Sequence, residues 1–124
     1  MNARKKILLV DDDSRNIFAL KAVLKARGYH CQTASSADNG IEQLNDDPEI
    51  GIVLMDMMMP DMDGYEAIAN IRGNPATAEI PVIAVTAQAM VGDKERCLAA
   101  GANGYISKPV DVDLLMEFLN TYLK

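Results

Sequence analysis

The chain has 124 residues, 49% of them hydrophobic, and a formal net charge of −6 at pH 7. This length suits one domain with its own core, and the acidic balance argues against a nucleic-acid-binding surface. The sequence has no apolar run long enough to span a membrane, and its charged start lacks the apolar region of a signal peptide. Cys31 and Cys97 lack metal-site spacing, so we expect two reduced thiols in a cytoplasmic protein.

The chain alternates short apolar runs with amphipathic segments from its start to its end. Apolar, β-branched runs bounded by turn residues predict strands at 7–10, 29–34, 50–55, 81–85 and 104–106. Apolar residues at helical spacing predict helices at 15–27, 37–44, 65–72, 92–100 and 112–123. This alternation predicts an α/β domain with a parallel sheet and right-handed crossovers. The strand at 29–34 is less apolar than the others, which places it nearer a sheet edge.

Small polar residues are placed to cap three of these helices. Their side-chain oxygens can accept the free backbone N–H groups of a first helical turn. The candidates are Asp13 or Ser14 for the first helix, Ser35 or Ser36 for the second and Asp111 for the last.

The run Ile-Val-Leu-Met-Asp-Met-Met-Met-Pro-Asp at 52–61 is the central stretch of the chain. An apolar run that stops at a turn signal is typical of a strand buried on both faces. Asp56 is therefore expected at the carboxyl end of a central strand, where open α/β sheets place their ligands.

Asp11, Asp12, Thr86 and Lys108 also fall just past predicted strands. Parallel strands all end on one edge of a sheet, so we expect these side chains to meet Asp56 there. Two carboxylates about 4 Å apart repel by roughly 4 kcal/mol at an effective dielectric near 20, so a proton or a cation must sit among them. Mg²⁺ suits a site of carboxylates, waters and phosphate oxygens.

An aspartate beside Mg²⁺ and a lysine is suited to attack phosphorus, because the cations neutralise charge on the phosphoryl oxygens. Carboxylates are established nucleophiles in aspartyl-phosphate chemistry. We therefore predict that Asp56 takes a phosphoryl group, with Lys108 beside it and the Thr86 hydroxyl on one phosphoryl oxygen.

Four motifs carry a resemblance to a known family over nearly the whole chain. They are LLVDDDSRN, VLMDMMMPDMDGYE, IPVIAVTAQAM and GYISKPVD. Together they resemble the response-regulator receiver domains of bacterial two-component signalling. The segments SRNIFAL and GDKERCLAAGANGYISKPVD are most similar to the C-terminal receivers of hybrid histidine kinases.

The resemblance implies a Mg²⁺-dependent phosphoacceptor site, with Mn²⁺ as a possible substitute. Asp56 would receive the phosphoryl group from a phosphohistidine donor. Asp12 would bind the metal directly and Asp11 more through water, while Asp56 and the backbone carbonyl of Met58 would complete the protein ligands. The partner would be a histidine kinase or a histidine phosphotransfer protein, with no nucleic acid and no membrane.

The resemblance also implies a fold and a switch. Thr86 and Lys108 would contact the phosphoryl group, and Thr86 with Tyr105 would change conformation in response. The fold would be a doubly wound, flavodoxin-like sheet of five parallel strands in the order 2-1-3-4-5, with five helices and a cis bond before Pro109. One receiver domain would span 1–124, with 1–4 as a flexible lead, and would act as a signalling domain rather than an enzyme.

Two further positions bear on the lifetime of the phosphoryl group. Met58 is the second residue after Asp56, and Gln88 is the second after Thr86. In the family, side chains at these positions influence how fast the phosphoryl group is lost. Neither is a good general base, so we expect no specially rapid self-hydrolysis.

Phe18 lies opposite the apolar stripe of the first predicted helix, so the core does not require it. Exposed apolar residues often mark a partner surface. We expect Phe18, with Arg15 and Pro109, to form part of the surface that meets the phosphodonor.

Other interpretations of these residues remain open. The acidic run at 11–13 could be an exposed capping turn, and Lys108 an ordinary surface lysine. Asp61-Met62-Asp63-Gly64 resembles the DxDG nucleophile motif of haloacid-dehalogenase-type phosphatases, but it follows a proline instead of the first strand. A nucleotide-binding flavodoxin-like module lacks support, because no glycine-rich phosphate loop follows a predicted strand.

Overall fold

The computed structural model describes residues 5–59, 63–87 and 92–123. Its strands are β1 (Lys6–Val10), β2 (His30–Ala34), β3 (Ile50–Asp56), β4 (Val82–Thr86) and β5 (Gly104–Ser107). Its helices are α1 (Ser14–Ala26), α2 (Ala37–Asp46), α3 (Gly64–Gly73), α4 (Asp93–Ala100) and α5 (Val112–Tyr122). Each bound lies within two residues of its prediction. The predicted lead at 1–4 lies outside the described residues.

The strands form one parallel sheet in the order β2-β1-β3-β4-β5, as the resemblance implied. The least apolar strand, β2, lies at an edge, which confirms its prediction. The bond between Lys108 and Pro109 is cis, also as implied. No helix within the described ranges is both long and apolar enough to cross a membrane.

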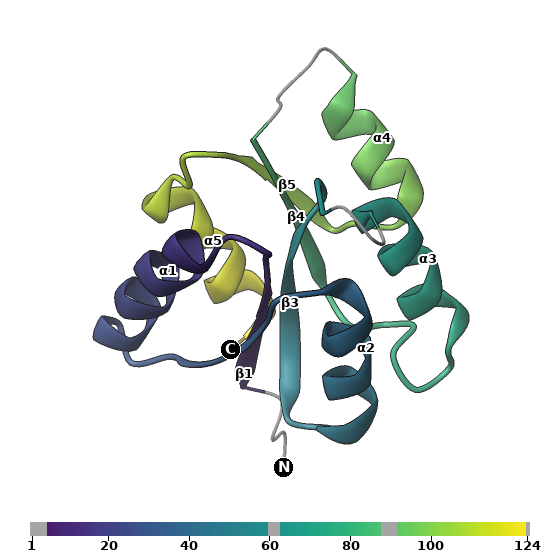
Figure 1. Cartoon of the computed structure of the whole chain (residues 1–124), viewed down its shortest axis with the longest axis horizontal. Helices are drawn as coiled ribbons and strands as arrows, with labels where there is room; N and C mark the ends of the chain where they lie inside the picture. The colour runs from purple at the N-terminus through teal and green to yellow at the C-terminus, as the bar shows by residue number, and fades with distance from the viewer. Residues whose placement is uncertain (1–4, 60–62, 88–91, 124) are drawn as a thin grey trace.

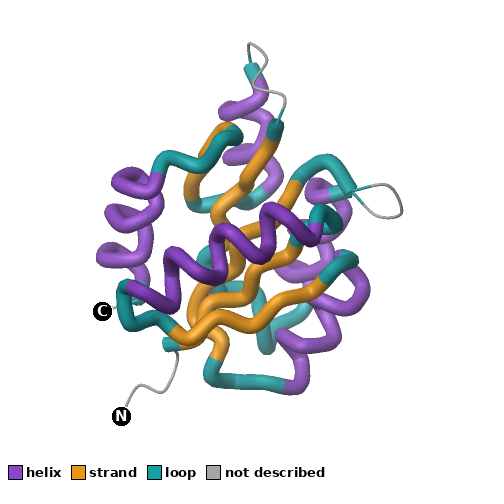
Figure 2. Tube along the Cα trace, turned by 60° about the vertical axis from the view of Figure 1, so that its left-hand side comes forward, coloured by secondary structure: helices purple, strands orange, loops and turns teal. Residues whose placement is uncertain are grey.

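Helices cover both faces of the sheet, with α1 and α5 on one side and α2, α3 and α4 on the other (Figures 1 and 2). Successive strand residues point to opposite faces, so each strand contributes to both cores. Ile7 belongs to the cluster that includes Leu24 of α1 and Leu115 of α5. Its neighbour Leu8 belongs to the cluster that includes Ile68 of α3.

The central strand β3 is buried along its whole length, as the run at 52–61 predicted. Each fully buried aliphatic side chain contributes about 1.5–3 kcal/mol through the hydrophobic effect. Cys31 and Cys97 are buried, free thiols within this packing. The sheet core therefore holds the carboxyl ends of the strands in fixed relative positions.

Side-chain caps fix the starts of the helices that leave the sheet. The side chain of Asp13 accepts the backbone N–H of Arg15, and that of Ser36 accepts the N–H of Asn39. Of the two candidate caps predicted for each helix, Asp13 therefore caps α1 and Ser36 caps α2. Asp111 caps α5 as predicted.

The first residue of α3 packs directly against the residue that follows β3. A Cβ placed on Gly64 would lie 2.8 Å from the backbone Cα of Met57, closer than real Cβ atoms approach. Glycine is therefore required for α3 to begin this close to the end of the central strand.

Candidate functional site

Three carboxylates meet at the rim of the sheet where its strands end. One ligand oxygen from each of Asp11, Asp12 and Asp56 lies within 4.8 Å of the other two. Asp11 directly follows β1 and is buried, Asp56 ends β3 and is buried, and Asp12 is exposed. The structure thus brings together the acidic residues that the sequence predicted to converge. We call the rim formed by Asp11, Asp12, Asp56, Thr86 and Lys108 the carboxyl edge.

Asp56 and Thr86 are the last residues of their strands instead of the first residues beyond them. Asp56 pairs in register with Val85, and Thr86 with Ser107, because the parallel ladder continues one residue further than predicted. This extension orders both backbones at the carboxyl edge.

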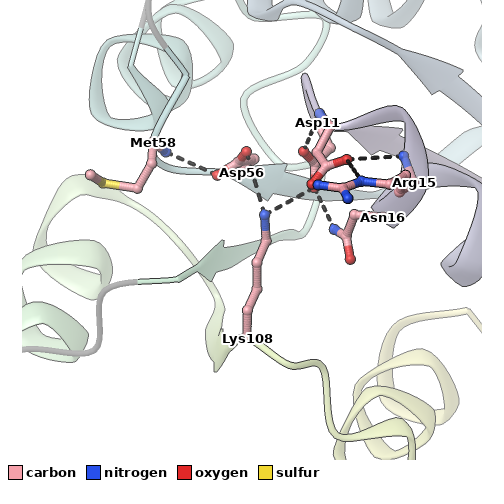
Figure 3. A network of polar contacts seen from close by, with 7 residues as sticks. Asp11, Arg15, Asn16, Asp56, Met58 and Lys108 are labelled. Carbon is pink, nitrogen blue, oxygen red and sulfur yellow. Dashed lines mark hydrogen bonds and ion pairs between the residues drawn. The ribbon is translucent and has the colours of Figure 1, made fainter.

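Lys108 reaches from the end of β5 to both buried carboxylates (Figure 3). Its Nζ lies 3.2 Å from Asp11 Oδ2 and 3.6 Å from Asp56 Oδ2. Its backbone N–H donates to the Thr86 carbonyl at 2.7 Å, which fixes where the side chain starts. Burial favours a lower pKa for Lys108, but the hydrogen bond to Asp11 and the charge of Asp56 outweigh it, so the pKa is raised. The ammonium therefore stays charged at neutral pH.

Asp56 is held by a backbone donor on one side and faces Lys108 on the other. Its Oδ1 accepts the N–H of Met58 at 3.0 Å. Burial raises the pKa of Asp56 and the charge of Asp11 adds to this, whereas the Met58 N–H and Lys108 act in the opposite direction. The net effect is a raised pKa, so one ammonium does not fully stabilise this carboxylate.

A hard divalent cation fits the chemistry of this donor set. The carboxyl edge offers hard carboxylate oxygens and carries negative charge that a single lysine leaves uncompensated. Mg²⁺ prefers such oxygen ligands and needs one or two carboxylates. Asp11, Asp12 and Asp56 could hold it, with the Met58 carbonyl as the further predicted ligand.

Thr86 and Tyr105 lie on the α4 side of the site. Thr86 is buried. It lines a cleft of about 350 Å³ together with Met58, from the loop after β3, and Arg96 of α4. Tyr105 in β5 is half-buried and packs against the core on this side. Burial, followed by the charges of Asp93 and the Cys97 thiol, raises the pKa of Tyr105, so its phenol is neutral.

The predicted partner residues are exposed. Phe18 on α1 is 77% exposed and lies outside the hydrophobic core, as expected. Arg15 is exposed and pairs with Asp13, its Nε lying 3.6 Å from Oδ1. Pro109 is exposed beside Lys108. The contact of these residues with a phosphodonor stays a prediction.

Asn16 belongs to the site, although no role for it was predicted from the sequence. Its side-chain amide donates a hydrogen bond to Asp11 Oδ2 (Figure 3). Asn16 stands in the first turn of α1, three residues after Asp13, the last residue of the acidic run. That position was the available signal, because a first helical turn folds back towards the strand end that precedes it.

Two earlier expectations fall on residues outside the described ranges. Gln88, which bears on phosphoryl lifetime, is one of them, and Asp61 of the phosphatase-like motif is the other. Asp63 of that motif is described, and it caps α3 by accepting the Glu66 N–H at 2.9 Å. Helix capping therefore accounts for the acidic residue before Gly64.

The sequence matches the model of one protein family, described as the response regulator receiver domain, over residues 7–120. Over 116 residues it is 40% identical to Sensor histidine kinase RcsC and 37% identical to Signal transduction histidine-protein kinase BarA, both of Escherichia coli strain K12. Each match covers 94% of this chain but only 12% of the relative, so the chain spans a small part of these longer proteins.

One solved structure with the same fold contains a magnesium ion. It is the receiver domain of sensor histidine kinase PA1611 from Pseudomonas aeruginosa PAO1, with a magnesium ion coordinated in its active-site cleft. The two chains superpose with a TM-score of 0.86 and 33% identity, covering 96% of this chain and 97% of the other.

Proposed function

This chain belongs to the response regulator receiver domain family, and from that membership we propose that it accepts a phosphoryl group on Asp56 as a signalling domain of a two-component phosphorelay. The observation that carries the proposal is the meeting of Asp11, Asp12 and Asp56 with Lys108 at the carboxyl edge. These residues come from the ends of three different strands, and packing alone does not require so many like charges in one place.

The residues of the chain position and stabilise the acceptor. The Met58 N–H holds one oxygen of Asp56, which turns the other towards Lys108. The charged ammonium of Lys108 stabilises negative charge on the incoming phosphoryl oxygens. Thr86, one strand away, offers a hydroxyl to one of those oxygens. Mg²⁺, or Mn²⁺ in its place, would supply further positive charge to the phosphoryl oxygens and lower the repulsion among the carboxylates.

Phosphorylation would act by shifting a conformational equilibrium that already exists. Thr86 lies between the acidic cluster and the cleft beside α4, so a contact with the phosphoryl group would draw it towards Asp56. Tyr105, half-buried beneath α4, would then repack as the second switch residue. The domain itself would relay a signal and turn over no substrate.

The proposed donor is the phosphohistidine of a histidine kinase or of a histidine phosphotransfer protein. Arg15, Phe18 and Pro109 would form part of the surface that meets it. Receiver segments of RcsC and BarA, to which the chain is similar, belong to histidine kinases. The cytoplasmic location inferred from the sequence stays a prediction.

Incubation with acetyl phosphate and Mg²⁺ tests the proposal directly. We expect one phosphoryl group per chain, lost in Asp56→Asn and retained in the exposed control Asp46→Asn. Chelation of Mg²⁺ should slow labelling by at least about tenfold, because the cation contributes to transition-state charge stabilisation. Labelling of Asp56→Asn at the wild-type rate would overturn the proposal.

The phosphorylated protein also tests the expectation about lifetime. Because Met58 is not a general base, we expect the acyl phosphate to persist well beyond seconds in buffer. A lifetime of seconds would contradict this part of the proposal.

The partner surface is tested by comparing two exposed apolar residues on different helices. Phe18→Ala should slow phosphotransfer from a phosphohistidine donor by roughly tenfold, since a buried aromatic anchor often contributes over 1 kcal/mol to an interface. Leu98→Ala on α4 is the matched control and should leave this transfer unchanged. Both variants should react normally with acetyl phosphate, and equal effects of the two would refute the surface.

A further inference from the structure

The carboxylate of Asp11 is surrounded by donors from three segments of the chain. Its Oδ1 accepts the backbone N–H of Asp13 at 2.9 Å. Its Oδ2 accepts from the side-chain amide of Asn16 and from Lys108 Nζ, the latter at 3.2 Å. Asp11 is only 1% exposed, so bulk water has little access to this oxygen. Asn16 and Lys108 therefore share one buried acceptor atom.

The ammonium of Lys108 contacts the carboxylates of both Asp11 and Asp56. The proposed function requires it at Asp56, where the phosphoryl group would be added. Its Nζ is nearer to Asp11 Oδ2 than to Asp56 Oδ2, at 3.2 Å against 3.6 Å. A phosphoryl group on Asp56 would add negative oxygens on that side. Movement of the ammonium towards them would weaken its bond to Asp11, and a buried carboxylate oxygen without a donor is costly.

We propose that Asn16 is a positioning residue that keeps Asp11 Oδ2 hydrogen-bonded while Lys108 turns to the phosphoryl oxygens on Asp56. The inference rests on the proposed function and deepens it, because it names the residue, Asn16, that allows Lys108 to leave Asp11. In the ground state both donors reach Oδ2, and in the phosphorylated state the amide of Asn16 alone retains that oxygen. Asn16 does not touch the reacting atoms and acts only through Asp11 and Lys108.

Helix capping does not account for the side chain of Asn16. Asp13 is the N-cap of α1, and its carboxylate accepts the Arg15 N–H at 2.9 Å. The amide of Asn16 points instead to Asp11, between α1 and the sheet (Figure 3). The side chain thus connects the first turn of α1 to the acidic cluster.

The test compares Asn16→Ala with Asn120→Ala, the same substitution at an exposed position of α5. With saturating acetyl phosphate and Mg²⁺, we expect Asn16→Ala to be labelled on Asp56 about tenfold more slowly than wild type. Its Mg²⁺ dissociation constant, measured by calorimetry, should change less than about threefold. Asn120→Ala should match wild type in both measurements. A merely structural role of Asn16 would instead weaken Mg²⁺ binding and labelling together.

A double-mutant cycle with Lys108→Ala provides the decisive readout. Without the lysine there is nothing for Asn16 to release, so Asn16→Ala should cause no further loss in that background. An undiminished tenfold loss there would overturn the inference, as would a wild-type labelling rate in the single variant. If Asn16→Ala does not fold, Asn16→Ser is used in the same cycle, because its hydroxyl is too short to replace the amide.

The same experiment separates this inference from the proposed function. If wild-type protein gains no phosphoryl group on Asp56, the proposed function itself fails. If wild type is labelled and the cycle shows additive losses, only the role of Asn16 fails.

Discussion

The two edges of the sheet differ in how their charged groups are paired. At the amino edge, where β4 and β5 begin, the guanidinium of Arg72 donates to a full set of acceptors. At the carboxyl edge, three carboxylates lie close together, and the ammonium of Lys108 contacts two of them. Arg72 of α3 donates to the Gly101 carbonyl at 2.7 and 3.1 Å, to Ile80 at 2.6 Å and to Ala78 at 3.0 Å. It also donates to Asn103 Oδ1 at 2.8 Å. The amino edge is thus locked by satisfied hydrogen bonds.

At the carboxyl edge, negative charge exceeds the positive charge that compensates it. Asp56 has a raised pKa from burial and from the charge of Asp11, despite the presence of Lys108. A site that binds a cation and a phosphoryl group needs negative charge that is not fully compensated before they arrive. The fold is thus stabilised at one edge of the sheet, and the other edge is left for a ligand at some cost in stability.

The amino edge should give the largest change in stability. Arg72→Met removes hydrogen bonds from several carbonyls, so we expect the free energy of unfolding to fall by about 3 kcal/mol. Arg72→Lys should recover part of this loss, because a single ammonium cannot reach all the acceptors. Urea denaturation of the three proteins measures the difference. A loss below about 1 kcal/mol for Arg72→Met would remove the contrast between the two edges.

A substitution at the carboxyl edge should increase stability instead of lowering it. Asp56→Asn removes a buried charge, so without Mg²⁺ at pH 7 we expect it to raise the free energy of unfolding by about 1 kcal/mol, a usual size for one favourable substitution. The raised pKa of Asp56 gives the sign: its contribution is favourable below the unfolded pKa of 3.8 and is lost as pH rises through the folded pKa.

Two controls sharpen this prediction. The difference in unfolding free energy between Asp56→Asn and wild type should shrink as pH falls through the raised folded pKa of Asp56 and below the unfolded pKa of 3.8, because the aspartate is then protonated in both states. Millimolar Mg²⁺ should also narrow it by stabilising wild type through binding. The exposed substitution Asp46→Asn should show neither effect. A metal-free Asp56→Asn protein that is less stable than wild type would mean that the site is not strained by its charge.

The smallest effect is expected at Cys31, in the edge strand β2 and away from both clusters. Burial raises the pKa of the Cys31 thiol to about 11, with Lys21 acting slightly in the opposite direction. Its contribution is therefore fully present below pH 9 and is lost as pH rises from 9 towards 11. At pH 10 wild type should lose up to about 1 kcal/mol more stability than Cys31→Ala, relative to pH 7. Equal losses in urea denaturation would contradict the raised pKa.

Most of the carboxyl edge could be predicted from the sequence, because strand ends are visible in it. The apolar run before Asp56 and the β-branched run before Asp11 fix where each strand stops, and parallel strands share an edge. Exposure of Phe18 followed from helical spacing alone. The sheet order and the cis bond before Pro109 needed the family resemblance, since neither has a local signal.

Other contacts could not be predicted, and the reason is physical. The acceptors of Arg72 are mostly backbone carbonyls, which every residue carries and no residue type reveals. The bond from Asn16 to Asp11 depends on the rotamer of one side chain and on the angle at which α1 leaves the sheet. Such details are set by tertiary packing instead of by periodicity.

The proposed function requires that Asp56, at the carboxyl edge of the sheet, receives a phosphoryl group. The most direct measurement is reduction of the acetyl-phosphate-treated protein with borohydride, followed by mass spectrometry of its peptides, because reduction converts an acyl phosphate into a stable homoserine. We predict homoserine at position 56 and at no other aspartate, and much slower formation of it when Mg²⁺ is chelated. Homoserine at Asp61 or Asp63, or none at all in folded protein, would contradict the account.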